Sequence, residues 1–106
     1  AVCRGGKEHR RDDAALRALY EGAAALLAAE GIETEPTRFS PWGLRVPERS
    51  PVTASRAFQE GLVEVQDEGS QLIALLTGAR PGMRVADYCA GAAGKTLAVA
   101  AMMGNR

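Results

Sequence analysis

Asp87-Tyr88-Cys89-Ala90-Gly91-Ala92-Ala93-Gly94-Lys95-Thr96 is a run of mostly small residues between two apolar segments, residues 83–86 and 97–103. This order predicts a strand, a tight loop and a helix. Small residues let a ligand approach the backbone closely, and a helix start offers free N–H groups. The pattern is typical of a cofactor-binding turn at the carboxyl end of a first parallel strand. There Asp87 would accept hydrogen bonds from a cationic amine or fix the loop.

Two nucleotide-binding motifs resemble this loop without fitting it. A Walker A loop requires glycine five residues before the Gly-Lys-Thr run, and this chain has Cys89 at that position. Cysteine does not readily adopt the positive φ that glycine supplies there. The segment Gly91-Ala92-Ala93-Gly94 also departs from the G-x-G-x-x-G pattern of dinucleotide sites. Phosphate binding is therefore disfavoured.

The overall charge points to no particular partner. The 106 residues include 13 basic and 13 acidic side chains, so no global field indicates nucleic acid. The local distribution is less even, because residues 38–58 contain four arginines and one glutamate, whereas the charged residues of 60–68 are all acidic. A solvated surface explains this bias as readily as a binding site does.

Cysteine usage and hydropathy further restrict the class of protein to which the sequence can belong. Cys3 and Cys89 are too few for a disulfide framework or a zinc site, and His9 has no partner at ligand spacing. No secretory or membrane-spanning apolar run is present. We therefore expect a soluble cytoplasmic protein with no metal site and no membrane association. Because the chain opens without methionine and stops just after a helix, we expect it to be a piece of a longer protein.

Residues 1–57 are predicted to form a small α+β subdomain. A helix starting at Asp12 or Asp13 and ending at Gly31 is expected, because apolar residues recur every three or four positions. These residues are Leu16, Leu19, Tyr20, Ala23, Leu26 and Leu27. Short strands are expected at residues 2–3 and 44–46, and residues 32–37 are expected to form a strand edge or a loop that is broken at Pro36. Trp42 is expected to be structural rather than to stack on a base.

Residues 58–106 are predicted to begin an α/β domain. A strand at 62–65 precedes a helix that Asp67 would cap and Gly78 would end, and a Pro-Gly turn then leads to a strand at 83–87. This order is that of a doubly wound fold. A lone parallel strand would leave both of its edges unpaired, so we expect residues 62–106 to be marginally stable alone or to associate with a second copy.

Two segments carry a family resemblance. Val65-Gln66-Asp67-Glu68-Gly69-Ser70-Gln71-Leu72 and the stretch from Asp87 to Thr96 resemble two signatures of the Fmu/Sun-type RNA cytosine-5 methyltransferases, and residues 58–61 resemble the element before the first signature. The resemblance covers residues 58–106 and is vaguer before them, where the family carries a small RNA-binding subdomain. It implies the start of a Rossmann-like methyltransferase domain at 58–106, preceded by an RNA-binding-like subdomain at 1–57.

The resemblance also implies a cofactor and a substrate. The loop formed by Cys89, Ala90, Gly91, Ala92, Ala93, Gly94 and Lys95 would bind S-adenosyl-L-methionine, and the substrate would be RNA, with ribosomal RNA expected. The family's catalytic cysteines lie in later Pro-Cys and Thr-Cys motifs, and residues 1–106 contain neither. The acidic residue that follows a second strand and holds the cofactor ribose is also missing. We therefore expect no catalytic residue in this chain and no activity from it alone.

One departure from the family bears on the cofactor. The family usually has two glycines before the lysine, whereas this chain has Ala93-Gly94. If position 93 requires a positive φ, alanine costs on the order of 1 kcal/mol and its methyl group would crowd the ligand.

Two alternative functions remain open from the sequence. The first is a non-catalytic RNA-binding module that uses the basic residues Arg4, Lys7, Arg10, Arg11, Arg45 and Arg49. The second is a structural piece whose loop binds nothing.

Overall fold

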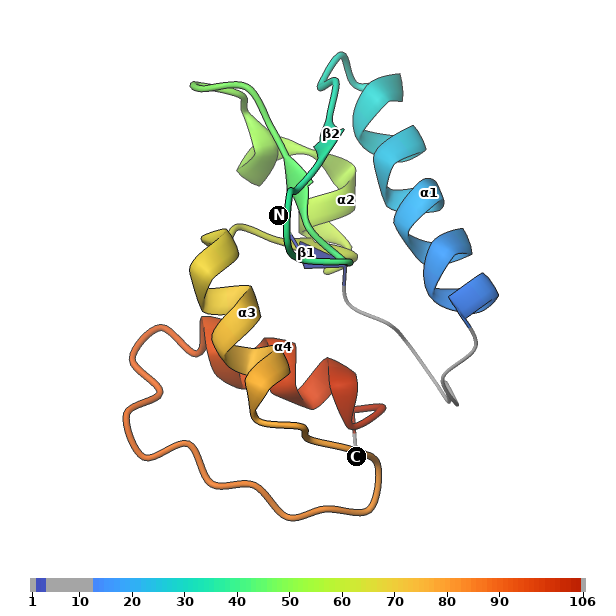
Figure 1. The fold of residues 1–106 in the computed structure, drawn as a ribbon. Coiled ribbons are helices and arrows are strands. Elements are labelled where there is room, and N and C mark those ends of the chain that lie inside the picture. The colour runs from blue at the N-terminus through green and yellow to red at the C-terminus, as the bar shows by residue number, and fades with distance from the viewer. Residues whose placement is uncertain (1, 4–12, 106) are drawn as a thin grey trace.

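The computed structural model describes residues 2–3 and 13–105, and Figure 1 shows the path of the chain. The elements are, in order, β1 (Val2–Cys3), α1 (Asp13–Ala29), β2 (Glu35–Pro36), β3 (Leu44–Arg45), the short 3-10 turn η1 (Val52–Ala54), α2 (Arg56–Gln59), β4 (Val63–Glu64), α3 (Glu68–Leu76) and α4 (Gly94–Met102). His9, Asp12 and the basic residues at positions 4, 7, 10 and 11 lie outside the described residues.

The strands form two short antiparallel ladders. β1 pairs with β4, so that Val2 lies opposite Glu64. β2 pairs with β3, so that Glu35 lies opposite Arg45. The strands predicted at 2–3, 44–46 and 62–65 are therefore confirmed in position, although each is only two residues long. Of the two alternatives for residues 32–37, a strand forms at Glu35–Pro36.

One hydrophobic core holds α1, the β2–β3 hairpin and α2 together. Its buried members are Ala23, Leu27, Ile32, Leu44, Val52, Ala57 and Val63. The end of α1 turns the chain into this core, because Gly31 has φ +79° and the N–H of Ile32 donates to the carbonyl of Leu27 at 2.9 Å. Glycine adopts this conformation without strain, and the predicted end of the helix is confirmed.

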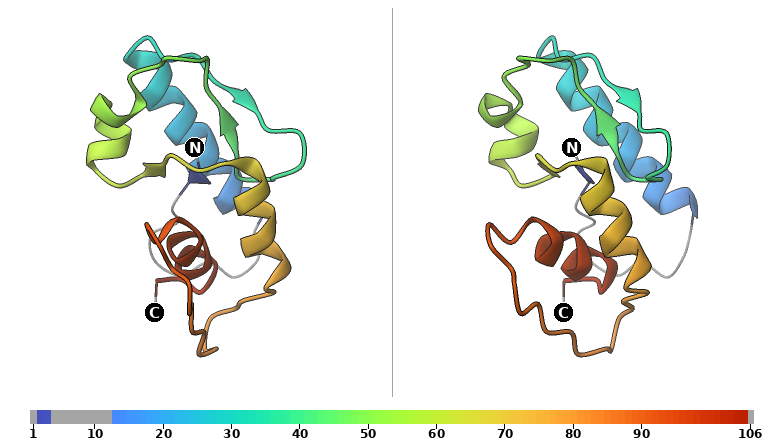
Figure 2. Two further views of the ribbon diagram at one scale, coloured as in Figure 1. Left: turned by 90° about the vertical axis from the view of Figure 1, so that its left-hand side faces the viewer. Right: turned by 60° about the vertical axis from the view of Figure 1, so that its left-hand side comes forward.

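The last two helices, α3 and α4, pack against each other, as both views of Figure 2 show. Asp67 caps α3 by accepting a hydrogen bond from the N–H of Ser70 at 3.1 Å, and Gly78 follows its end with φ +62°. Both predictions for this helix are confirmed. Ala74 of α3 and Ala98 of α4 are buried, and such small side chains allow two helices to approach closely.

The strand predicted at residues 83–87 is wrong. Figure 1 shows the segment between α3 and α4 as a wide arc without secondary structure, and residues 81–92 are all exposed. A strand requires hydrogen bonds to a neighbouring strand, and the described residues offer no partner to this segment. The Rossmann-like start is therefore not confirmed. The described fold is a small mixed domain of helices and short strands, compatible with the α/β class.

Within the described part of the chain, no helix is both long and apolar enough to cross a membrane. The division into residues 1–57 and 58–106 stays a prediction.

Amide exchange tests whether the segment between α3 and α4 lacks backbone hydrogen bonds. The N–H groups of residues 84–88 have no backbone acceptor among the described residues, so we expect them to exchange much faster than the amides inside α1 and α3. Hydrogen–deuterium exchange followed by NMR on a dilute, monomeric sample measures this directly. Slow exchange of residues 84–88 in the monomer would contradict the structure. Slow exchange that develops only as the concentration rises would show association with a second copy through this segment.

Candidate functional site

The seven residues predicted to bind the cofactor lie together in one turn at the start of α4. They are Cys89, Ala90, Gly91, Ala92, Ala93, Gly94 and Lys95. The N–H of Ala93 donates to the carbonyl of Ala90 at 2.8 Å, and Gly91 between them has φ +53°. Ala93 and Gly94 are half-buried and the other five are exposed. The backbone of this turn is therefore open to a ligand.

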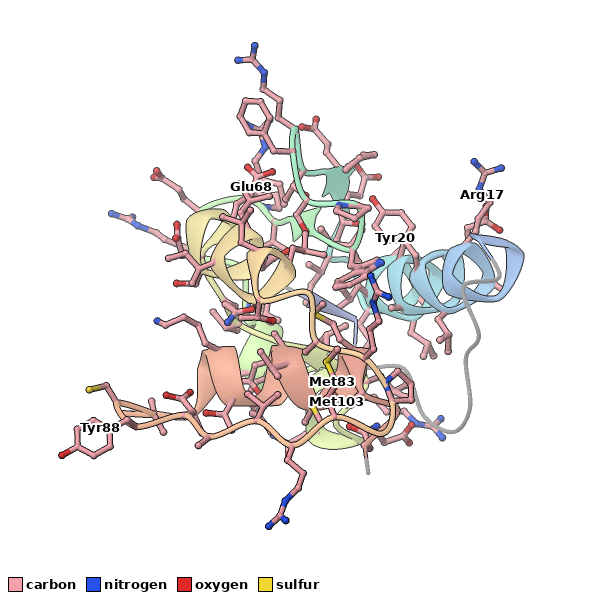
Figure 3. All side chains as sticks on the ribbon, turned by 60° about the horizontal axis from the view of Figure 1, so that its bottom comes forward. Arg17, Tyr20, Glu68, Met83, Tyr88 and Met103 are labelled. Carbon is pink, nitrogen blue, oxygen red and sulfur yellow. The ribbon has the colours of Figure 1, made fainter. Side chains whose placement is uncertain are left out.

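The carboxylate of Asp87 ties the two ends of the turn together. One oxygen, Oδ1, accepts a hydrogen bond from the N–H of Cys89 at 3.2 Å, and the other, Oδ2, accepts one from the hydroxyl of Thr96 at 2.6 Å. Of the two roles predicted for Asp87, fixing the loop is the one that the structure shows. Tyr88 projects away from the rest of the molecule, as Figure 3 shows. Its side chain is 100% exposed.

Ala93 has a left-handed backbone, with φ 62° and ψ 12°. Position 93 therefore adopts a positive φ, which is the case in which alanine is expected to be costly. A Cβ atom in this conformation costs roughly 1–2 kcal/mol, which glycine would avoid. The strained residue is also the one from which α4 starts.

The start of α4 lacks a side-chain cap. Ser55 caps α2 and Asp67 caps α3, but Ala93 has no side-chain oxygen to offer. No hydrogen bond within the described residues uses the N–H groups of residues 94–96. The positive end of the helix dipole is thus exposed beside Lys95, an arrangement that favours a bound carboxylate or other anion.

Gln66 brings the two sequence signatures into contact. A Cβ atom at Gly94 would lie 3.4 Å from Nε2 of Gln66, so the Gln66 side chain lies against the first residue of α4. The side-chain Nε2 and Oε1 atoms of Gln66 are buried and have no hydrogen-bond partner among the described residues. An unsatisfied buried amide costs roughly 1–3 kcal/mol. A polar group is therefore held in an unfavourable state next to the candidate site.

Sequence reasoning missed the role of Glu68 and Gln71. Oε1 of Glu68 accepts hydrogen bonds from the N–H groups of Phe39 at 2.6 Å and Ser40 at 2.9 Å, and Gln71, which is 2% exposed, accepts one from the Ser40 hydroxyl at 2.6 Å. Figure 3 shows Glu68 where α3 meets the β2–β3 loop. The available signal was the three-residue spacing, which places both side chains on one face of α3.

Replacing Ala93 by glycine tests the strain in the turn. We expect Ala93→Gly to raise the free energy of unfolding by about 1 kcal/mol, because it removes the left-handed Cβ while making the unfolded chain more flexible. Chemical denaturation measures the change. Ala92→Gly is the matched control, since Ala92 is not among the residues with positive φ, and it should leave stability unchanged or lower it. A loss of stability in Ala93→Gly would contradict the left-handed backbone.

The pH dependence of stability tests the contact between α3 and the β2–β3 loop. Hydrogen bonds from the backbone of Ser40 and Phe39 lower the pKa of Glu68 from its usual value of 4.5. A lowered pKa contributes stability above the unfolded value, and this contribution is lost as pH falls through the folded pKa. We therefore expect the denaturation midpoint of the native chain to fall more steeply below about pH 4.5 than that of Glu68→Gln. Parallel pH profiles for the two proteins would contradict the contact.

Comparisons with known proteins identify relatives that match this chain over only part of their own length. No family model and no solved structure matches the chain. Ribosomal RNA small subunit methyltransferase B of Pseudomonas syringae pv. tomato is 36% identical over 95 residues, which is 90% of this chain and 19% of that protein. The protein of the same name from Pseudomonas putida is 38% identical over 95 residues, or 90% of this chain and 20% of its own length.

A third relative comes from another bacterium. The probable ribosomal RNA small subunit methyltransferase B of Bacillus subtilis is 32% identical over 80 residues, or 76% of this chain and 18% of that protein. The chain thus spans about a fifth of the length of the curated relatives it matches. The resemblance predicted from the two signatures is confirmed: this chain is similar to the ribosomal RNA small subunit methyltransferase B proteins over that fifth of their length.

Proposed function

We propose that this chain supplies the cofactor-binding loop of a cytoplasmic, S-adenosylmethionine-dependent RNA methyltransferase that forms 5-methylcytosine in ribosomal RNA. Similarity to proteins named ribosomal RNA small subunit methyltransferase B supports the class of enzyme. The observation that carries the cofactor assignment is the uncapped start of α4 beside Lys95, with three free N–H groups at residues 94–96.

The charges of the loop suit the methionine end of S-adenosylmethionine, which carries a carboxylate and an amine. The N–H groups of residues 94–96 and the ammonium of Lys95 would hold the carboxylate, a role that helix starts commonly perform for anions. Asp87 would accept from the amine. Each of its oxygens has one hydrogen bond, and a carboxylate oxygen can accept two. When bound, the cofactor supplies the methyl group on its sulfonium.

The chain's own part in the reaction is binding rather than activation. Methyl transfer to C5 of cytosine requires a thiolate that adds to C6 and makes C5 nucleophilic. Cys89 is exposed in the binding loop itself, and in the family that this chain resembles the catalytic thiols belong to other motifs. We therefore assign residues 89–95 to holding the methyl donor, with activation of the cytosine left to other parts of such an enzyme.

Isothermal titration of S-adenosylmethionine into the chain tests the proposal. We expect binding to the native chain and tighter binding to Ala93→Gly, because glycine removes a methyl group that would crowd the ligand. Lys95→Met should weaken binding about tenfold, because hydrogen bonds to charged groups contribute roughly 1.5–3 kcal/mol and this one is exposed. Arg84→Met is the matched control, since Arg84 is an exposed cation outside the loop and should not affect affinity.

The absence of binding heat for both the native chain and Ala93→Gly at millimolar cofactor would contradict the proposal. If RNA nevertheless bound with an affinity that falls as salt rises, the chain would act as the non-catalytic RNA-binding module considered from the sequence.

A further inference from the structure

The loop between β2 and β3 presents an aromatic ring to solvent. The side chain of Phe39 is 63% exposed, and the guanidinium carbon of Arg38 lies 4.9 Å from the centroid of its ring. Resting on the proposed function, we propose that Arg38 and Phe39 form a stacking contact for an unpaired base of the RNA substrate. Phe39 is a better stacking residue than Trp42, the aromatic residue considered for this role from the sequence. Trp42 is half-buried and its Nε1 atom is buried.

Hydrogen bonds fix the backbone of the loop that carries the Phe39 ring. The N–H of Phe39 itself donates to Glu68, and the neighbouring Ser40 donates through its N–H to Glu68 and through its hydroxyl to the buried Gln71. Within the loop, the hydroxyl of Thr37 donates to the carbonyl of Ser40 at 2.8 Å. A Cβ atom at Gly43 would collide with the Thr37 side chain, so the loop closes tightly. Such preorganisation reduces the entropy lost when a partner binds.

The charge beside the ring favours RNA as the partner. No ion pair among the described residues includes Arg38, whereas Arg45 is paired with Glu35 at 2.5 Å. The acidic neighbour Glu68 already accepts two backbone N–H groups. An exposed cation over an aromatic ring offers a base both a stacking surface and a cation–π partner, and it also attracts the phosphate backbone.

The geometry favours single-stranded over duplex RNA. Bases in an A-form helix are stacked on one another, and sequence-reading proteins reach them in loops, bulges and ends, where aromatic and arginine side chains replace the neighbouring base. One protruding ring next to one arginine matches a single unstacked base. It does not match the long shallow groove of a duplex.

Fluorescence anisotropy with the 106-residue chain and two labelled RNAs, an unstructured decamer and a blunt hairpin, tests the inference. We expect the decamer to bind more tightly than the hairpin. Phe39→Ala should weaken decamer binding roughly 5- to 100-fold, the loss typical of one stacked base, and Phe39→Tyr should retain it. Leu76→Ala is the control, because Leu76 is another apolar side chain that is 86% exposed and should leave affinity within about twofold of the native value. Equal denaturation midpoints verify that the variants fold.

Three results would overturn the inference. Native affinity in Phe39→Ala would show that the ring does not contact RNA, while the proposed function would stand. Native affinity in Phe39→Leu would show that apolar area rather than stacking matters, as for a protein partner. No RNA binding by the native chain, even in low salt, would overturn this inference and the RNA part of the proposed function together. The cofactor titration would still decide the remaining part.

Discussion

The hydrogen bonds that the β2–β3 loop donates to Glu68 and Gln71 of α3 are the interaction on which the rest of the described structure depends. Ser40 and Gln71 are both buried, and their side chains satisfy each other. Glu68 satisfies two further backbone donors of the loop. Removing one partner of such a buried pair costs roughly 1–3 kcal/mol, because the other is left without a hydrogen bond. The loop and α3 are therefore fixed relative to each other, and α4 is fixed in turn by its packing on α3.

The turn before α4 combines strain with an open polar surface. Ala93 is held in a left-handed conformation, the helix that follows is uncapped, and the buried amide of Gln66 lies unsatisfied against Gly94. Each of these features is unfavourable for an empty chain. Asp87 offsets part of the cost by tying the turn to Thr96. Strain and unsatisfied polar groups cluster at ligand-binding sites, and this supports the proposal that the cofactor binds at this turn.

Local signals in the sequence predicted helices α1, α3 and α4, but not the short α2. The Asp67 cap and the glycines at 31 and 78 act within one turn of chain, so their effects can be read from neighbouring residues. The left-handed backbone at Ala93 was considered only as a condition, because the family usually has glycine there, and the structure shows it. The seven candidate residues are contiguous in sequence, so finding them in one turn was the expected result.

Interactions between distant residues could not be predicted in the same way. A strand at residues 83–87 requires a partner strand that the described residues lack, so apolar character alone was misleading. The bond from Phe39 to Glu68 spans 29 positions, and nothing in either local pattern indicates it. The exposed pair formed by Arg38 and Phe39 was missed for the same reason, because only the anchored loop distinguishes it from an ordinary turn.

The most direct test of the cofactor site is a 15N–1H correlation spectrum of the labelled chain recorded with and without S-adenosylmethionine. We expect the largest shifts at the amides of Gly94, Lys95 and Thr96, which would donate to the cofactor carboxylate. The amides of Phe39 and Ser40, already bonded to Glu68, should not move. Shifts confined to residues outside the 87–96 turn, or no shifts at millimolar cofactor, would contradict the assignment.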